Sequence, residues 1–155
     1  MSAEHDAAIA EELAWQCAEQ MWSNDHASKA LGMSLEAVAV GAATITMTVR
    51  RDMVNGLNIC HGGLIFALSD SAFAFACNSQ NEAAVAASCT IEFLRPAKLD
   101  DTLTATAKMV HQGRRTGIYD IKVSNQRGEV VAQFRGRSAR IGQPVVVSPV
   151  LNVDD

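Results

Sequence analysis

The chain has 155 residues, of which 48% are apolar, and this size fits one domain with a hydrophobic core. The formal net charge of −4 argues against general nucleic-acid binding. No apolar run reaches the roughly 18 residues of a membrane-spanning helix, and the acidic N-terminus lacks a basic secretory signal, so we expect a cytoplasmic protein that does not enter membranes.

Residues 6–22 are rich in Ala and Glu, which favours a helix. Four of its less polar residues recur at i, i+4 spacing on one face: Ile9, Leu13, Cys17 and Met21. A short second helix is expected to end at Gly32. Residues 33–49 then alternate and are β-branched on both sides of Gly41, which predicts a hairpin, and turn signals make residues 51–63 a loop.

Residues 64–80 are apolar nearly all round and predict a long buried helix. Four strand-like runs follow, and the short turns between them predict antiparallel neighbours. The runs cover about residues 85–95, 102–112, 117–125 and 130–141. The expected architecture is α+β, with a curved antiparallel sheet wrapped around the long central helix.

Asp70 is the first candidate for chemistry because it lies in the middle of this apolar helix. An unpaired carboxylate is costly there, and Asp is a poor residue for a helix interior. We therefore interpret it as a catalytic base or nucleophile facing a cleft. The alternative is a carboxylate that is locally solvated or hydrogen-bonded.

The start of the same helix reads Cys60-His61-Gly62-Gly63. The first N–H groups of a helix have no partner within the helix and lie at the positive end of its dipole, which suits an oxyanion. Glycine lets a ligand approach the backbone closely, although a simple turn is the alternative. Asn55 is either part of an Asn-Gly turn or an amide that orients water or substrate, and His61 is either a capping or an acid–base residue.

Gly62 and Asp70 are eight residues apart, which is about 12 Å along a helix. Base, water and carbonyl must lie within a few ångströms of one another. We therefore predict a dimer in which each site takes Gly62 from one chain and Asp70 from the other.

The four cysteines form no CxxC pair or zinc-like cluster, so we expect free thiols and no metal site. Cys60, beside His61, is a minor candidate for a reactive thiol. Residues 90–141 hold ten Lys or Arg against five Asp or Glu. These are either solvated strand edges or a site for a small polyanion, with Arg95, Arg114, Arg115 and Arg137 as candidates.

Three stretches strongly resemble the PaaI-type hotdog thioesterases of phenylacetate degradation, and the resemblance covers roughly residues 13–142. They are NGLNICHGGLIFALSDSAFAFACNSQ, CTIEFLRPAK and HQGRRTGIYDIKVSNQRGEVVAQFRGRSARIG. The resemblance implies a hotdog fold, with dimers that pair into a tetramer. It divides the chain into a helical segment at 1–32, a hotdog thioesterase domain at 33–142 and an irregular tail at 143–155.

The same resemblance assigns the catalytic carboxylate to Asp70 and the polarising amide to Gly62, with His61 and Gly63 in the same turn and Asn55 as the orienting amide. Some relatives place a Ser or Thr on the next strand, where this chain has Ala86 or Ala87, with Ser88 nearby.

The implied substrate is an aryl- or hydroxyaryl-acetyl-CoA, whose phosphates fit the basic half, and no separate cofactor is implied. Met53, Phe66 and Phe73 are either an acyl pocket or plain core. Two rival functions stay open: a hotdog dehydratase that uses His61 and Asp70, and a non-catalytic acyl-CoA-binding module.

Overall fold

The computed structural model describes residues 2–151 and begins with two helices. Helix α1 spans Ala3–Asn24 and α2 spans His26–Ala30, so both predicted helices are present. The α2 helix starts where the Asp25 side chain accepts a hydrogen bond from the Ser28 N–H group at 2.9 Å. None of the helices in this described part is both long and apolar enough to cross a membrane.

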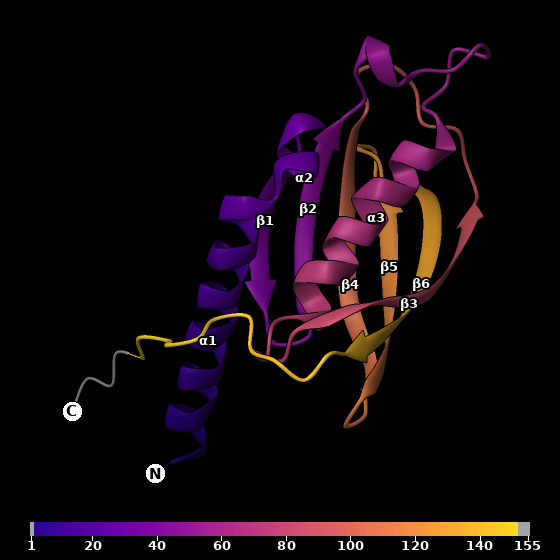
Figure 1. Ribbon diagram of the computed structural model, residues 1–155. Coiled ribbons are helices and arrows are strands. Elements are labelled where there is room, and N and C mark those ends of the chain that lie inside the picture. The colour runs from indigo at the N-terminus through magenta and orange to yellow at the C-terminus, as the bar shows by residue number, and fades with distance from the viewer. Residues whose placement is uncertain (1, 152–155) are drawn as a thin grey trace.

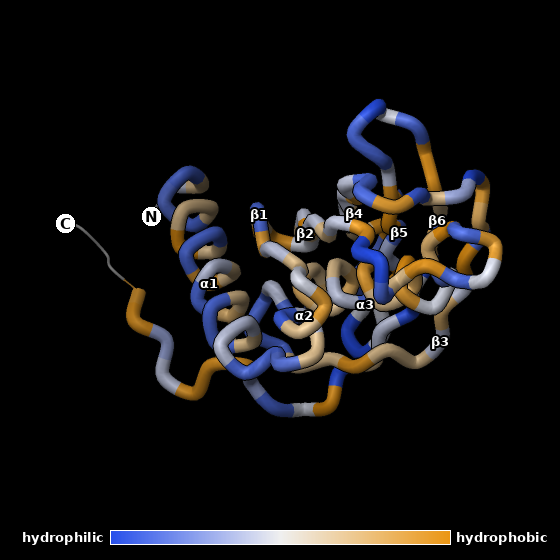
Figure 2. The backbone as a smooth tube through the Cα atoms, turned by 90° about the horizontal axis from the view of Figure 1, so that it is seen from above, coloured by the Kyte–Doolittle hydropathy of each residue, from blue (hydrophilic) through white to orange (hydrophobic). Residues whose placement is uncertain are grey.

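Six strands form one antiparallel sheet in the order β1-β2-β4-β5-β6-β3. They are β1 Ser34–Ala39, β2 Ala42–Thr48, β3 Ala84–Phe93, β4 Thr102–Gln112, β5 Thr116–Ser124 and β6 Val130–Arg140. The predicted hairpin forms β1 and β2, and its turn uses Gly41 at φ +69°. Viewed from above, the strands form an arc around α3, with α1 beyond β1 (Figure 2).

Helix α3 spans Gly62–Cys77 and lies on the concave face of the sheet, which confirms the predicted hotdog architecture (Figure 1). It begins two residues earlier and ends three residues earlier than predicted. Its buried side chains, such as Leu68, Phe73 and Phe75, pack in the core against the sheet. The prediction of burial on all sides is wrong for one stripe, which stays half-buried because it points away from the sheet. The stripe is Ala67, Asp70, Ser71 and Ala74.

The predicted neighbours of β3 are also wrong. β4, β5 and β6 pair in succession, whereas β3 pairs with β6 at the far edge of the sheet. The connection after β3 crosses the end of the sheet, where Ala97 accepts a hydrogen bond from the Cys60 N–H group at 2.8 Å and Lys98 forms a β-bridge with Ile59. The loop before α3 therefore holds this crossover in place.

Residues 143–151 form no helix or strand and cross back over α1 (Figure 1). Residues 152–155 of the predicted tail lie outside the described residues.

Candidate active site

The first turn of α3 leaves one N–H group free. His61 caps the helix, and its Nδ1 accepts a hydrogen bond from the Gly63 N–H group at 3.0 Å. The Leu64 N–H group donates to the His61 carbonyl at 3.0 Å. Within residues 2–151 no acceptor takes the N–H of Gly62. This group therefore lies unpaired at the positive end of the helix dipole, as an oxyanion donor must.

A cavity of about 250 Å³ opens beside Gly62. Its walls come from the loop before α3, from Ile65 of α3, and from residues 93–97 at and beyond the end of β3. The Phe93 ring covers the glycine so closely that a Cβ atom at position 62 would lie 3.1 Å from Phe93 Cζ. Sequence reasoning missed Phe93, because only the crossover of the chain brings it to the start of α3.

Asn55 lines the same cavity and also holds the loop that forms it. Its Oδ1 accepts hydrogen bonds from the N–H groups of Leu57 at 3.0 Å and Ile59 at 3.4 Å. Its Nδ2 has no acceptor within the described part of the chain. The turn role and the substrate-orienting role are therefore compatible, because they use different atoms.

Asp70 lines a second cavity, of about 440 Å³, between α3, the start of β3 and the tail. The carboxylate has no hydrogen-bond or ion-pair partner among residues 2–151, and burial raises its pKa. Burial also raises the pKa of Cys77, in the same cavity, to about 12, and the Asp70 charge adds to this shift. Ala86, one of the two positions to which the resemblance assigns a Ser or Thr in some relatives, lines this cavity.

No residue lines both the Gly62 cavity and the Asp70 cavity. One described chain thus holds the free donor and the unpaired carboxylate at separate openings. This is the separation that the helix length predicts.

The candidate arginines also lie at different ends of the sheet. Arg95 lines the Gly62 cavity and forms an ion pair with Glu129 at 3.1 Å. Arg114 and Arg115 lie in the turn between β4 and β5, where their carbonyls accept hydrogen bonds from Arg140. Arg95 is hydrogen-bonded to Val131 and Arg115 to Arg140, and these nine residues of β6 separate the two groups by about 30 Å. Arg137 lies between them, exposed on β6 and paired in register with Ser88.

The other candidates divide between cavity and core. Phe73 lines the Asp70 cavity, whereas Met53 and Phe66 pack around the core. Met21 of α1 and Val145 of the tail also line that cavity, and sequence reasoning missed both. The apolar run at 145–147 was the available signal that the tail packs against the protein.

Cys60 does not behave as a reactive thiol. Its side chain is buried, and burial raises its pKa to about 11, so the thiol stays neutral near pH 7. Among residues 2–151 no three His, Cys, Asp or Glu side chains gather to form a metal-binding group.

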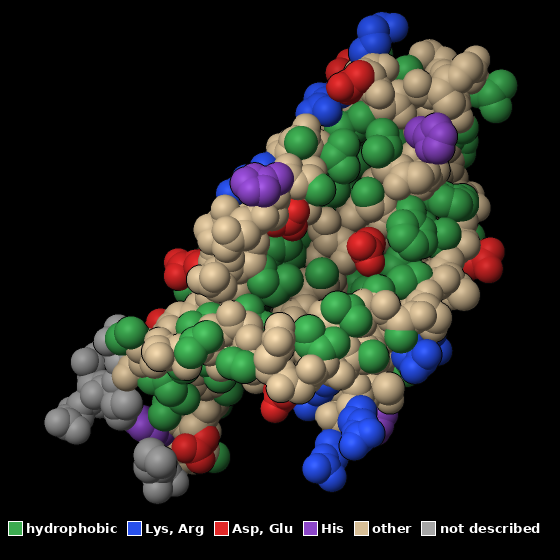
Figure 3. Space-filling model, in the orientation of Figure 1, with side chains coloured by type: hydrophobic (Ala, Val, Ile, Leu, Met, Phe, Trp, Pro, Cys, Tyr) green, Lys and Arg blue, Asp and Glu red, His purple; other side chains and the backbone are tan. Residues whose placement is uncertain are grey.

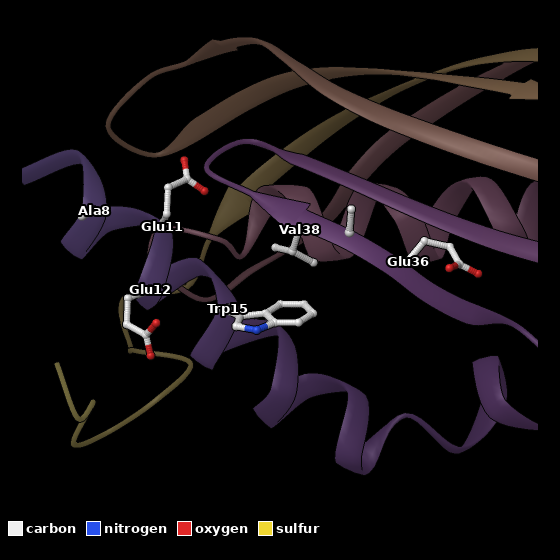
Figure 4. Close-up of a pocket in the computed structure, with 7 residues that line it drawn as sticks. Ala8, Glu11, Glu12, Trp15, Glu36 and Val38 are labelled. Carbon is white, nitrogen blue, oxygen red and sulfur yellow. The ribbon is translucent and has the colours of Figure 1, made fainter. Parts of the chain in front are cut away.

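A further cavity, of about 540 Å³, lies between α1 and β1 (Figure 4). Trp15 and Val38 line it together with three carboxylates, those of Glu11, Glu12 and Glu36. The negative charge of this groove opposes the binding of phosphates, so it does not suit the CoA moiety of a substrate.

Comparison with known proteins identifies the family of the chain. The model of the thioesterase superfamily matches residues 57–132. The chain is 56% identical to the acyl-coenzyme A thioesterase PaaI of Escherichia coli over 129 residues. This aligned region covers 83% of this chain and 92% of that protein.

Solved structures give the same result. The E. coli PaaI protein from the phenylacetic acid degradation operon superimposes with a TM-score of 0.85 at 54% identity, covering 86% of this chain and 97% of that one. A Streptococcus mutans protein bound to acetyl-CoA gives a TM-score of 0.70 at 30% identity, covering 72% and 90%. The chain therefore belongs to the thioesterase superfamily, as a PaaI-type acyl-CoA thioesterase of the hotdog fold.

Proposed function

We propose that this thioesterase hydrolyses aryl- or hydroxyaryl-acetyl-CoA esters to the free acid and CoA, at a site shared by two protomers. The observation that carries the proposal is the state of Asp70, a half-buried carboxylate that has no partner among residues 2–151 and lies in a largely apolar cavity. The operon of the E. coli relative supports an arylacetyl substrate. Perturbed carboxylates in clefts are typical of catalytic sites.

Two routes fit this arrangement, and the N–H of Gly62 stabilises the oxyanion in both. In one, Asp70 takes a proton from water while the water oxygen bonds to the thioester carbonyl carbon. The C–S bond then breaks, and the CoA thiolate takes up the proton. In the other, the Asp70 carboxylate attacks this carbon and expels CoA, which leaves a mixed anhydride that water hydrolyses. Neither route uses a separate cofactor, and we propose none.

The free edge of β3 supports the shared site. β3 ends the sheet, so its outer N–H and C=O groups are available to a second copy. Antiparallel pairing of two β3 strands places the end of one beside the start of the other. The Gly62 cavity borders the end of β3, and the Asp70 cavity borders its start. A two-fold dimer therefore brings Gly62 of one protomer to Asp70 of its partner.

The same pairing brings the divided arginines together. Arg95 follows the end of β3, whereas Arg114 and Arg115 lie near its start, because Ala84 pairs with Arg140 and the Arg140 N–H group donates to Arg115. In the dimer these groups flank one composite site, with Arg137 between them. We propose that they bind the phosphates of CoA.

We also propose that two such dimers form a tetramer and that the enzyme acts in the cytoplasm. The face that carries α3 shows broad hydrophobic areas with isolated acidic side chains, which favours a second contact there (Figure 3). The four free cysteines favour a reducing compartment.

Complementation between two inactive variants tests the shared site. Asp70→Asn should lower turnover about 10²–10⁴-fold. Gly62→Pro should lower it about 10²–10³-fold, because proline suits the first position of a helix and lacks the N–H group, although its ring also adds a Cβ beside Phe93. Co-expressed subunits should regain about a quarter of wild-type activity, since half of the dimers are mixed and each mixed dimer holds one intact site. Release of free CoA thiol is the measurement.

Gly62→Ala is the control, because it adds the same Cβ beside Phe93 but keeps the N–H group. Activity of the mixture that does not exceed the sum of the two variants would exclude a site shared in this way. Wild-type turnover of Asp70→Asn would remove the carboxylate from the mechanism.

A further inference from the structure

The chain after β6 returns to the Asp70 cavity as a segment without helix or strand, residues 143–150, which we call the C-terminal strap. Its start pairs with the turn before β3. The Ile141 N–H group donates to the Ala83 carbonyl at 2.9 Å, and the Ala83 N–H group donates to the Gln143 carbonyl at 2.8 Å. The strap then crosses α1 (Figure 1).

Two side-chain amides clamp the strap as a neighbouring strand would. Asn81 Oδ1 accepts from the N–H groups of Val145 at 3.0 Å and Val146 at 2.8 Å, and its Nδ2 donates to the Val146 carbonyl at 3.1 Å. Gln16 of α1 forms the same two-way pair with the N–H and C=O groups of Val150. The backbone of the strap is therefore fixed at both ends.

A third amide fixes the opposite side of the cavity. Asn78, at the end of α3, accepts a hydrogen bond from the Ala84 N–H group at 2.8 Å and donates to the Ala84 carbonyl at 3.1 Å. The cavity thus lies between two backbone segments, residues 83–86 and 143–145, that side-chain amides hold at defined positions.

The lining of this cavity suits an uncharged, bulky group. Among the described residues, Asp70 is the only charged residue that lines the cavity. The strap contributes Gln143, Pro144 and Val145 to the wall. The volume of about 440 Å³ lies within the roughly 300–1,000 Å³ of small-molecule sites. The described lining of this cavity offers no cation to bind the phosphates of CoA, whereas its apolar side chains suit an apolar acyl group.

We propose that the C-terminal strap, clamped by Asn81 and Gln16, is one wall of the acyl pocket and sets the size of the acyl group that the enzyme accepts. This inference rests on the proposed function, because it takes Asp70 as the reacting carboxylate. Val145 is the residue that limits the size of the acyl group. Asn81 is a positioning residue that acts through the strap.

Substitution of Val145 tests the wall. Val145→Phe fills the cavity, so kcat/KM for phenylacetyl-CoA should fall about 10- to 100-fold relative to acetyl-CoA. Val145→Ala should raise kcat/KM for a bulkier ester, naphthylacetyl-CoA, relative to kcat/KM for phenylacetyl-CoA. Val147→Phe is the matched control, because Val147 lies on the same strap but is 86% exposed, and it should keep the wild-type ratio.

Substitution of Asn81 tests the clamp. Asn81 has φ +58°, a conformation that glycine adopts freely, so Asn81→Gly removes the amide without straining the turn. The amide hydrogens of Val145 and Val146 should exchange faster, and selectivity between phenylacetyl-CoA and naphthylacetyl-CoA should weaken.

Unchanged acyl selectivity in both Val145→Phe and Asn81→Gly, with normal acetyl-CoA hydrolysis, would overturn the role of the strap and leave the proposed function standing. Full activity of Asp70→Asn would instead overturn the proposed function.

Discussion

Asp70 is held in an environment that favours its neutral form. Its carboxylate is half-buried, and burial raises its pKa above the ordinary value of 3.8. The folded state therefore binds this proton more tightly than the unfolded state does. Between the ordinary and the raised pKa values, the stability that depends on Asp70 falls as the pH rises. Above its raised pKa the ionised carboxylate thus destabilises the fold, and this is the form that the proposed mechanism uses as base or nucleophile.

This linkage predicts that Asp70→Asn is more stable than the wild type at pH 7, by about 1 kcal/mol. The difference should shrink as the pH falls through the raised pKa, and it should vanish below 3.8, where both states are protonated. Urea unfolding at a series of pH values measures it.

Asp52→Asn is the matched control. Arg50 lies 3.0 Å from the Asp52 carboxylate and, chiefly through its hydrogen bond, lowers the pKa of that group, so removal of this charge should give no gain. A wild type that is as stable as Asp70→Asn at pH 7 would show that the Asp70 carboxylate is not destabilised by its surroundings.

Local sequence signals mark the candidate reactive groups but not the walls of the cavities around them. Asp70 stands out because a charge interrupts an apolar helix, and Gly62 because glycines follow a capping histidine. Met21, Phe93 and Val145 reach the cavities through contacts between distant segments, and the apolar patterns around Met21 and Val145 indicate packing without indicating which cavity they line. The sequence therefore predicts the chemistry more readily than the selectivity.

At the scale of elements, one glycine allows α3 to approach the sheet. Gly136 of β6 faces Phe73, and a Cβ atom there would lie 2.6 Å from Phe73 Cε1. The Phe73 ring is buried, with ring centroids of Tyr119 at 5.7 Å and Phe134 at 6.0 Å, so it has little room to move. The helix and the sheet are thus fitted to each other at this contact.

Gly136→Ala should therefore lower the free energy of unfolding by about 1–3 kcal/mol through overpacking. Adding Phe73→Leu should recover part of this loss, because the smaller side chain makes room for the new methyl group. Denaturant unfolding of both single variants and the double variant measures the coupling.

Gly56→Ala serves as the control, with an expected change within about 0.5 kcal/mol, because no atom lies within 4 Å of a Cβ built there. Additive effects of Gly136→Ala and Phe73→Leu would mean that the two positions do not constrain each other.

Most elements of the fold could be predicted from the sequence, but parts of their arrangement could not. Both N-terminal helices, the hairpin, α3 and the four later strands follow from local periodicity and turn residues. The position of β3 does not, because a short connection usually joins neighbouring strands and here crosses the end of the sheet. The outward stripe on α3 was missed for a similar reason, since only the tertiary arrangement decides which apolar face stays uncovered.

At the scale of the whole molecule, the edge formed by β3 is a strong candidate for an interface. Val85 and Phe93 on this strand and Leu94 after it are each more than half exposed. Long exposed edge strands with apolar side chains tend to pair with another chain. Ser88 and Thr90 lie on the convex face of the edge, in register with Arg137 and Arg135 of β6.

Lysines at these two positions should separate the proposed dimer. Ser88→Lys with Thr90→Lys places like charges opposite one another across the two-fold axis, at a cost of several kcal/mol and hence about a 100-fold or larger rise in the dimer dissociation constant. Since the proposed site joins Gly62 of one protomer to Asp70 of its partner, thiol release should fall with the fraction of dimer. Sedimentation velocity and activity over the same concentration series test this. The control Gln133→Lys places the charge on β6, one strand away from the edge. It should leave the dimer dissociation constant and thiol release unchanged. Monomers that keep full activity would show that each chain holds a complete site.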